Sequence, residues 1–329
     1  MRRPIVATIV AALVLLVMPA TAEAAGQVRA RAGAAYLADQ QKANGSIPAF
    51  SAIGSTADAV LAFTAVGDRP RARTRAIGFL RRQVRKGRVD TVGEVAKVLM
   101  AVVAGGRDPR SFGGSNLVKE LRSQIGNDGH IGDATVFDQA LGILALEATG
   151  IQPARRVTRW LADAQCPVGG WSFDAPYASG TDDENCHDGT PDDFFTADTN
   201  TTSYAVMALA DVGRSGEAAP PFPFLKGARD ATHGGWGYTP GFDTDANSTA
   251  LVIQAYVAAG RRIPKGAMKA LRDLQPDIGC GAWSFTYVSG DPGPPDVGAT
   301  IGAIPAIVRA SFPLEATPRT TRSRPTRGC

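Results

Sequence analysis

Histidine, cysteine and aromatic residues are scarce in this sequence. Its 329 residues include three histidines and four cysteines, and aromatic side chains make up 7% of the chain. The cysteines are widely spaced, unlike the close pairs that bind structural zinc, and the histidines fall in or beside predicted loops. We therefore expect neither a metal nor another cofactor. These seven residues are Cys166, Cys186, Cys280, Cys329, His130, His187 and His233.

Long hydrophobic runs are missing after residue 25, so no membrane span is expected in the body of the chain. Residues 1–25 combine Arg2 and Arg3 with an apolar run and the small-residue pattern Ala22-Glu23-Ala24, which predicts a secretory signal peptide. The formal net charge of +4 comes from the two ends, and the neutral body argues against nucleic-acid binding. Residues 314–329, rich in Thr, Pro and Arg, are predicted to be a disordered basic tail. We expect a protein that is secreted or held in the cell envelope, with its folded domain over residues 26–313.

Export makes disulfides the expected use of the cysteines. Cys166 and Cys186 lie on either side of one turn, and closing the loop between them should stabilise the fold by about 3 kcal/mol in the chain-entropy description. Cys280 is an alternative partner for either residue.

A turn of the form Gly-x-(Ile/Val/Trp) occurs six times, at intervals of 42, 42, 40, 65 and 47 residues. Such periods are typical of solenoids or of closed rings of helix pairs. A Gln precedes five of the turns. The six turns begin at Gly45, Gly87, Gly129, Gly169, Gly234 and Gly281.

Each turn separates two kinds of predicted helix. Residues 267–275 place apolar and charged side chains on opposite sides, which predicts an outer helix, whereas residues 248–259 are almost free of charge and predict a buried inner helix. Further outer helices are expected over 34–41 and 116–124, and inner helices over 55–66, 91–104 and 135–149 and from 199 onward. Four inner helices start at an aligned Asp that can cap the free amides. These residues are Asp90, Asp198, Asp245 and Asp296.

The motif Gln165-Cys166-Pro167-Val168-Gly169-Gly170-Trp171 resembles the repeats of squalene and terpenoid cyclases and of protein prenyltransferase β subunits. The resemblance covers nearly all of residues 26–312 and implies an all-α fold, an α6/α6 toroid with six outer and inner helix pairs. It is much less specific for activity, because similar toroids serve as cobalamin carriers and as thioester domains.

The resemblance to class II cyclases implies a catalytic acid in an Asp-x-Asp-Asp motif. The nearest match, Asp243-Thr244-Asp245-Ala246, makes Asp245 the candidate acid, with Asp243 beside it, but lacks the last Asp. Asp245 also fits the position of a helix cap, which we favour as its role. Thioester domains need Gly-Cys-Gly-Glu-Gln, and Gly279-Cys280-Gly281 is not followed by Glu-Gln.

The connections from turn to inner helix should all emerge at one mouth of the ring, where a ligand is expected. An acidic insertion at residues 174–197 is predicted to be a lid tied down by Cys186; calcium binding there is an alternative. The predicted mouth residues are Asp90, Asp198, Asp296, Trp171, Trp236, Trp283 and Tyr238.

We therefore predict a non-catalytic protein that binds a bulky, partly apolar small molecule, terpenoid or corrinoid, at the mouth of the toroid. The alternatives are a cyclase that uses Asp245 and a cell-envelope interaction domain. Nine Lys and Arg residues within positions 69–88 either form a solvated outer face or contact anionic envelope polymers.

Overall fold

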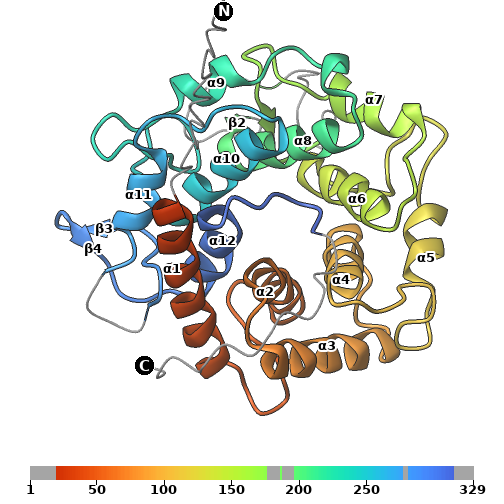
Figure 1. The fold of residues 1–329 in the computed structure, drawn as a ribbon. Helices are drawn as coiled ribbons and strands as arrows, with labels where there is room; N and C mark the ends of the chain where they lie inside the picture. Colours follow the sequence, from red (N-terminus) through yellow and green to blue (C-terminus); the bar gives the residue numbers. More distant parts are fainter. Residues whose placement is uncertain (1–19, 176–185, 187–195, 277–280, 315–329) are drawn as a thin grey trace, which may run out of the picture.

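Six strongly apolar helices form the inner ring of the structure, a computed structural model that describes residues 20–175, 186, 196–276 and 281–314. A helix that is apolar on every side needs protein around it, and a second ring of helices supplies that cover (Figure 1). The inner helices are α2 (Ala52–Val66), α4 (Val92–Ala104), α6 (Val136–Ala148), α8 (Thr199–Asp211), α10 (Ala246–Ala258) and α12 (Val297–Ile307). The outer helices are α1 (Ala20–Asp39), α3 (Pro70–Arg85), α5 (Leu117–Ser123), α7 (Arg155–Asp163), α9 (Phe222–Gly227) and α11 (Ala267–Asp273).

The ring is closed by contacts between its first and last helices. Each inner helix packs against the next one along the chain, and α12 packs back against α2. The outer helix α1 also packs against α12. This order confirms the predicted toroid of outer and inner helix pairs.

All six inner helices begin with a side-chain cap, whose oxygen accepts a hydrogen bond from the backbone N–H three residues later. Asp90, which we predicted as the cap of the second inner helix, is exposed, and the adjacent Thr91 caps α4 through the backbone N–H of Glu94. Thr and Asp are both good caps, so the spacing of the repeats could not separate these neighbours. The six caps are Ser51, Thr91, Thr135, Asp198, Asp245 and Asp296.

Helix α1 departs most from the predicted boundaries, because it starts at Ala20 and not near residue 34. Ala24 and Ala25 are exposed, and burial begins at Gly26. A Cβ on Gly26 would lie 2.7 Å from the backbone oxygen of Ile307, so glycine allows α1 to approach α12 closely. In the described part of the chain, no helix has the length and apolar character needed to cross a membrane.

Three buried tryptophans hold the turns between the two rings. In each case the indole N–H donates to a leucine carbonyl in the preceding outer helix. The backbone N–H of the same residue donates to a threonine hydroxyl in the following inner helix. Trp171 bonds Leu161 and Thr202, Trp236 bonds Leu225 and Thr249, and Trp283 bonds Leu271 and Thr300.

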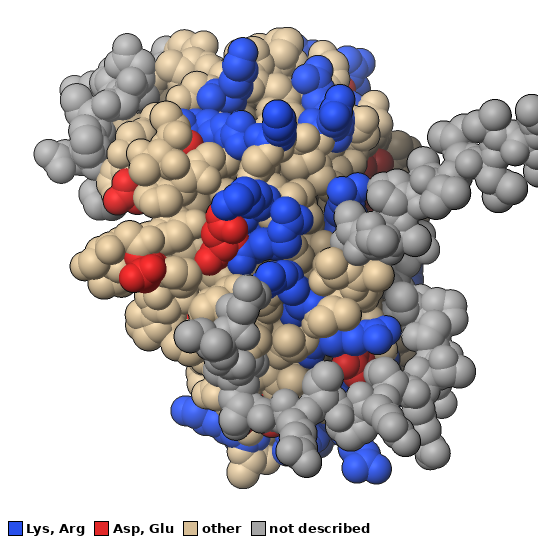
Figure 2. All heavy atoms as spheres, turned by 60° about the vertical axis from the view of Figure 1, so that its left-hand side comes forward, with Lys and Arg blue, Asp and Glu red and all other residues tan. Residues whose placement is uncertain are grey.

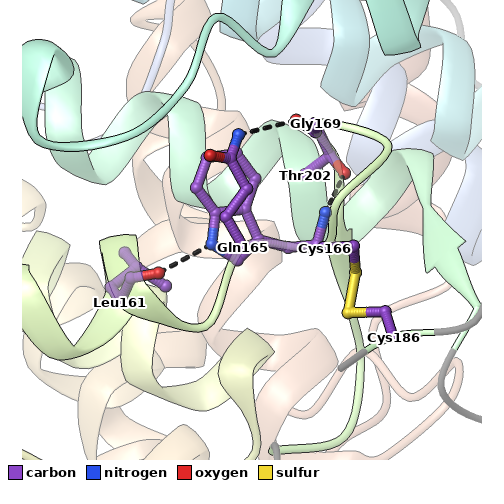
Figure 3. The surroundings of a disulfide bond; sticks show 7 residues. Leu161, Gln165, Cys166, Gly169, Cys186 and Thr202 are labelled. Carbon is purple, nitrogen blue, oxygen red and sulfur yellow. Dashed lines mark hydrogen bonds between the residues drawn. A yellow bond between two sulfur atoms is a disulfide. The ribbon is translucent and has the colours of Figure 1, made fainter. Parts of the chain in front are cut away.

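Side-chain amides near the turns connect successive repeats. Gln165 Nε2 donates to the carbonyl of Gly169 in its own turn at 2.8 Å (Figure 3). It also donates to the carbonyl of Ala219, ahead of α9, at 3.0 Å. The Gln before the turn therefore links one repeat to the next in repeats one, four and six, whereas Gln139 of α6 makes the link in repeat three and Arg229 makes it in repeat five. Equivalent bonds join Gly45 to Ala72 through Gln41, Gly129 to Val157 through Gln139, Gly234 to Lys265 through Arg229, and Gly281 to Arg29 through Gln275.

The two ends of the ring differ. The N-terminal ends of the inner helices border the mouth, where two short antiparallel pairs lie, β1 (Trp171–Ser172) with β2 (Ala197–Asp198) and β3 (Tyr287–Val288) with β4 (Asp291–Pro292). At the other end, the segment after α12 crosses the centre of the ring (Figure 1). Phe312 in this segment stacks on Tyr204 of α8, with ring centroids 6.2 Å apart. Its side chain lies across the inside of the ring at this end and forms the floor of the space that the inner helices enclose.

Candidate functional site

A cavity of about 350 Å³ lies inside the inner ring, between the mouth and Phe312. All six inner helices contribute to its wall. Gly298 and Gly302 of α12 allow Phe50 and Asn247 to approach this helix closely, because a Cβ at either glycine would lie 2.7 Å from one of these side chains. Much of the remaining lining is aromatic or aliphatic, including Phe137, Tyr204, Leu251, Ile301 and Phe312. A cavity of this size and character is typical of small-molecule sites.

Exposed aromatic side chains surround the mouth. Phe173, Tyr238 and Phe285 each stand two residues after a turn tryptophan and are 40%, 41% and 42% exposed. Phe50, which precedes α2, is 79% exposed and lines the cavity with Tyr238 and Phe285. We term these four residues the aromatic rim.

Backbone hydrogen bonds fix the positions of three rim residues. Their carbonyl groups accept the N–H of the first residue of the preceding inner helix. Val136 donates to Phe173, Thr199 to Tyr238 and Ala246 to Phe285, at 3.0, 2.8 and 2.8 Å respectively. The rim is thus built into the start of α6, α8 and α10. Solvent-exposed apolar groups gathered at a cavity entrance are typical of a binding surface.

An ion pair lies on the cavity wall between α2 and α4. Lys97 Nζ is 2.8 Å from Asp58 Oδ2, and both residues line the cavity. Burial alone would lower the pKa of Lys97, but the Asp58 carboxylate raises it above its ordinary value, so the amine stays protonated. The positive charge of Lys97 is therefore already compensated inside the protein.

The candidate acid Asp245 lines the cavity, but both of its oxygens are engaged. Oδ1 accepts the backbone N–H of Ser248 and Oδ2 accepts the hydroxyl of the same residue, each at 2.7 Å. Burial raises the pKa of Asp245 to about 6, against hydrogen bonds from Ser248 and Asn247 that lower it. Asp243 is exposed and does not share this environment. The geometry is that of a helix cap.

Asp198 holds the same position at the start of α8 and is more deeply buried. Its Oδ1 accepts the backbone N–H of Thr201 at 2.7 Å. Burial raises the pKa of Asp198 to about 7, although the hydrogen bond from Thr201 lowers it.

Gln254 contributes an unusual polar group to the cavity wall. This residue of α10 is 1% exposed, and neither its Nε2 nor its Oε1 has a hydrogen-bond partner among the described residues. Leaving a buried amide unpaired is costly. Gln254 thus leaves one donor and one acceptor unpaired in the cavity wall. Sequence analysis did not identify Gln254 as a candidate site residue, because it lies within a run of apolar helix positions.

The structure brings only part of the predicted mouth set together. Tyr238 lines the cavity, and Asp198 lies behind it, whereas the exposed Asp90 is not among the lining residues. Asp296 caps α12 through the backbone N–H of Ala299.

The prediction that turn tryptophans border the mouth needs correction. Trp171, Trp236 and Trp283 are fully buried between the two helix rings, and none lines the cavity. Their indole N–H groups need partners, which the outer helices supply. The aromatic rim stands two positions later in the repeat, and aligning residues at that offset would have found it.

The predicted disulfide between Cys166 and Cys186 is present, and it lies beside the turn that Gln165 stabilises (Figure 3). Most of the predicted lid at 174–197 falls outside the described residues, as do Cys280, Cys329 and His187. The alternatives for calcium and for Cys280 therefore stay predictions.

His130 lies in a turn but is only partly exposed. Its ring stacks on Trp160 with centroids 4.0 Å apart, and Nε2 lies 2.7 Å from the carbonyl oxygen of Ala134. His233 pairs with Asp230 in a similar local arrangement at 3.1 Å. Among the described residues, no group of three or more His, Cys, Asp and Glu side chains could hold a metal ion.

The basic stretch at residues 69–88 lies on and around the outer helix α3, away from the cavity. Most of its Lys and Arg side chains are exposed. Figure 2 turns the left-hand side of Figure 1 forward, where α1 and α11 lie, and shows further Lys and Arg side chains gathered there. Contact with anionic envelope polymers stays a prediction.

Sequence comparison matches no protein-family model and no curated protein. Among solved structures, the type II terpene cyclase MstE from Scytonema, in complex with geranylgeranyl dihydroxybenzoate, is similar with a TM-score of 0.59 at 13% identity. The GH76A alpha-1,6-mannanase from Salegentibacter gives 0.57 at 12% identity. The alignments cover 88% of this chain and 98% of each of those chains.

A protein from Actinoplanes gives a TM-score of 0.54 at 15% identity, over 87% of this chain and 98% of that chain. These likenesses support the resemblance to terpenoid cyclase-type α/α toroids that the repeats implied. Because proteins of different activity share this fold, these similarities show the architecture of the chain and not its activity.

Proposed function

We propose that this protein binds a bulky, partly apolar small molecule in the ring cavity without converting it. The observation that carries the proposal is the cavity itself, which has an aromatic rim at its entrance and Phe312 as its floor. Such a wall favours apolar surface through burial. Its polar groups supply orientation at a few points, as is usual in ligand sites.

A terpenoid ligand suits this cavity better than a corrinoid. A corrinoid carries amide groups around its edge, and each amide buried without a partner would cost free energy. The lining offers the side chains of Asn200, Asn247 and Gln254 at separate points, between aromatic and aliphatic groups. A flexible isoprenoid chain carries few polar groups that need hydrogen-bond partners in the cavity.

Equilibrium dialysis of the purified protein against farnesol and against cobalamin tests the proposal. We expect saturable farnesol binding with a stoichiometry of about one and no cobalamin binding. Cobalamin binding without farnesol binding would reverse the choice of ligand. Binding of neither compound would contradict the function.

The second candidate is a terpene cyclase, because Asp245 lines the cavity with a raised pKa and MstE shares the fold. A cyclase must hold its acid protonated and direct the proton at an alkene. Both Asp245 oxygens instead hold Ser248. Incubation with squalene followed by gas chromatography separates the two candidates, because a cyclised isomer has the mass of squalene but another retention time, and a binding protein returns squalene unchanged.

Hydrolysis of glycosides has less support in this site. That chemistry needs two carboxyl groups, one as acid and one as base or nucleophile. The carboxyl groups of the described cavity lining belong to Asp58, which is paired with Lys97, and Asp245, which caps α10. Neither carboxyl group is therefore free to act as the acid or as the base or nucleophile of glycoside hydrolysis.

Export from the cytoplasm is part of the proposal. The Cys166–Cys186 disulfide is compatible with an oxidising compartment, and burial of α1 starts at Gly26, directly after the predicted signal peptide. Mass spectrometry of protein from the culture medium should find an N-terminus at or next to Gly26. An intact, cytoplasmic chain with reduced Cys166 would contradict export.

A further inference from the structure

We infer that the ligand of the cavity is a neutral isoprenoid alcohol, whose hydroxyl group pairs with Gln254, and not a prenyl diphosphate. The inference rests on the proposed function and names the polar end of its ligand. It is carried by the unpaired Gln254 amide and by the charge balance of the cavity wall.

Gln254 is held in place for an external partner. It is the ninth residue of α10, about two turns beyond the cap, and its backbone belongs to a regular buried helix. Its Nε2 can donate and its Oε1 can accept, and both atoms lack partners among the described residues. A hydroxyl group satisfies such an amide in either orientation, because it can both accept and donate a hydrogen bond.

Gln139 shows what a structural glutamine does in the same fold. It is fully buried on α6, where Oε1 accepts from the backbone N–H of Ile131 at 3.0 Å. Its Nε2 donates to the carbonyls of Gly129 and Val157 at 3.0 and 3.1 Å. Every polar atom of that side chain is satisfied. Gln254 shares the residue type and the burial but makes none of these bonds.

The cavity wall does not offer a site for a phosphate group. Its charged side chains in the described part of the chain are Asp58, Lys97 and Asp245. Lys97 is already paired with Asp58 at 2.8 Å, so the wall holds no uncompensated cation. The favourable field of the inner-helix N-termini falls off within the first turn and does not reach Gln254. Burying a diphosphate here would leave its charge without partners.

Three ligands with the same isoprenoid chain test the inference: farnesol, the hydrocarbon farnesene and farnesyl diphosphate. Equilibrium dialysis should show that farnesol binds about five-fold more tightly than farnesene, the ratio expected for one hydrogen bond. Farnesyl diphosphate should bind more weakly than either. Tighter binding of the diphosphate, or equal binding of alcohol and hydrocarbon, would overturn the inference while leaving the proposed function intact.

The variant Gln254→Leu identifies the residue responsible. The preference for farnesol over farnesene should disappear. The melting temperature of the ligand-free variant should stay the same or rise, because an unpaired buried amide is removed. Gln139→Leu is the matched control and should lower the melting temperature. A farnesol preference that survives in Gln254→Leu would overturn the assignment, and failure of all three ligands to bind the wild type would refute the proposed function and this inference together.

Discussion

Asp245 holds Ser248 with both carboxylate oxygens, one on the backbone N–H and one on the hydroxyl, each at 2.7 Å. This arrangement closes the first turn of α10 at the wall of the cavity. A carboxylate used in this way stabilises a helix start and has no free oxygen directed at a ligand. These two hydrogen bonds favour a binding protein over a cyclase, because a cyclase would need Asp245 as its proton donor.

Substitution of Asp245 should affect stability and not chemistry. Asp245→Asn keeps an acceptor for the Ser248 N–H and should cost well under about 1 kcal/mol, whereas Asp245→Ala should cost about 1 kcal/mol or more. Urea denaturation measures both values. A cyclised squalene product that disappears in Asp245→Asn would show instead that Asp245 is a proton donor.

Gln275 closes the ring between the last repeat and α1. Its Nε2 donates to the carbonyls of Arg29 and Gly281, and its Oε1 accepts from Arg29 Nη1 at 3.1 Å. Gln275→Leu should lower the free energy of unfolding by about 2–3 kcal/mol, because it leaves buried polar groups without this partner.

Gln124 provides the control for that measurement. It holds the corresponding place before the third turn, but its side chain makes no hydrogen bond within the described residues. Gln124→Leu should cost less than about 0.5 kcal/mol. Equal costs for the two variants would show that ring closure does not depend on the Gln275 amide.

The Cys166–Cys186 disulfide spans 20 positions of the chain. Its loss in Cys186→Ala should lower the free energy of unfolding by about 3 kcal/mol. Reduction of the wild type should produce a similar loss, and reduction of the variant should add little. Thiol titration of the folded wild type should find Cys166 and Cys186 unreactive. An unfolding midpoint that does not respond to reduction would contradict a stabilising role.

Asp198 should make stability depend on pH. Burial raises its pKa in the folded protein to about 7 from an ordinary value of 3.8. Between these values unfolding releases a proton, so the free energy of unfolding falls as the pH rises through this window. Asp198→Asn keeps the cap but does not titrate. The variant should gain about 1 kcal/mol or more on the wild type between about pH 4 and pH 7.5, and a difference that is constant with pH would contradict the prediction.

Local signals predicted most of the fold. The third inner helix was expected over 135–149 and is Val136–Ala148, because Thr135 and Thr149 at its two ends are the capping residues. Turn spacing and apolar periodicity are likewise properties of neighbouring residues. The cap of α4 was placed one residue too early, because Asp90 and Thr91 are both residues that cap helices and only the structure shows that Thr91 does so.

The cavity could not be predicted in the same way, because it depends on residues that meet only across the ring. Asp58 and Lys97 belong to different repeats, and Phe312 reaches the floor from the segment after the last helix. The tryptophans were expected at the mouth because they stand at the turns, where the connections to the inner helices begin. Their size instead fills the space between the helix rings, and the smaller aromatic residues two positions later face the entrance.

Obstructing the cavity tests the central claim most directly. Leu251 lines the middle of the wall, and Leu251→Trp should fill space that the ligand needs, whereas Val28→Trp adds the same side chain at an exposed position of α1. The measurement is the dissociation constant for farnesol in both folded variants. The account predicts at least about ten-fold weaker binding in Leu251→Trp and no change in Val28→Trp. Equal affinity in Leu251→Trp and the wild type would show that the ligand does not bind in the ring cavity.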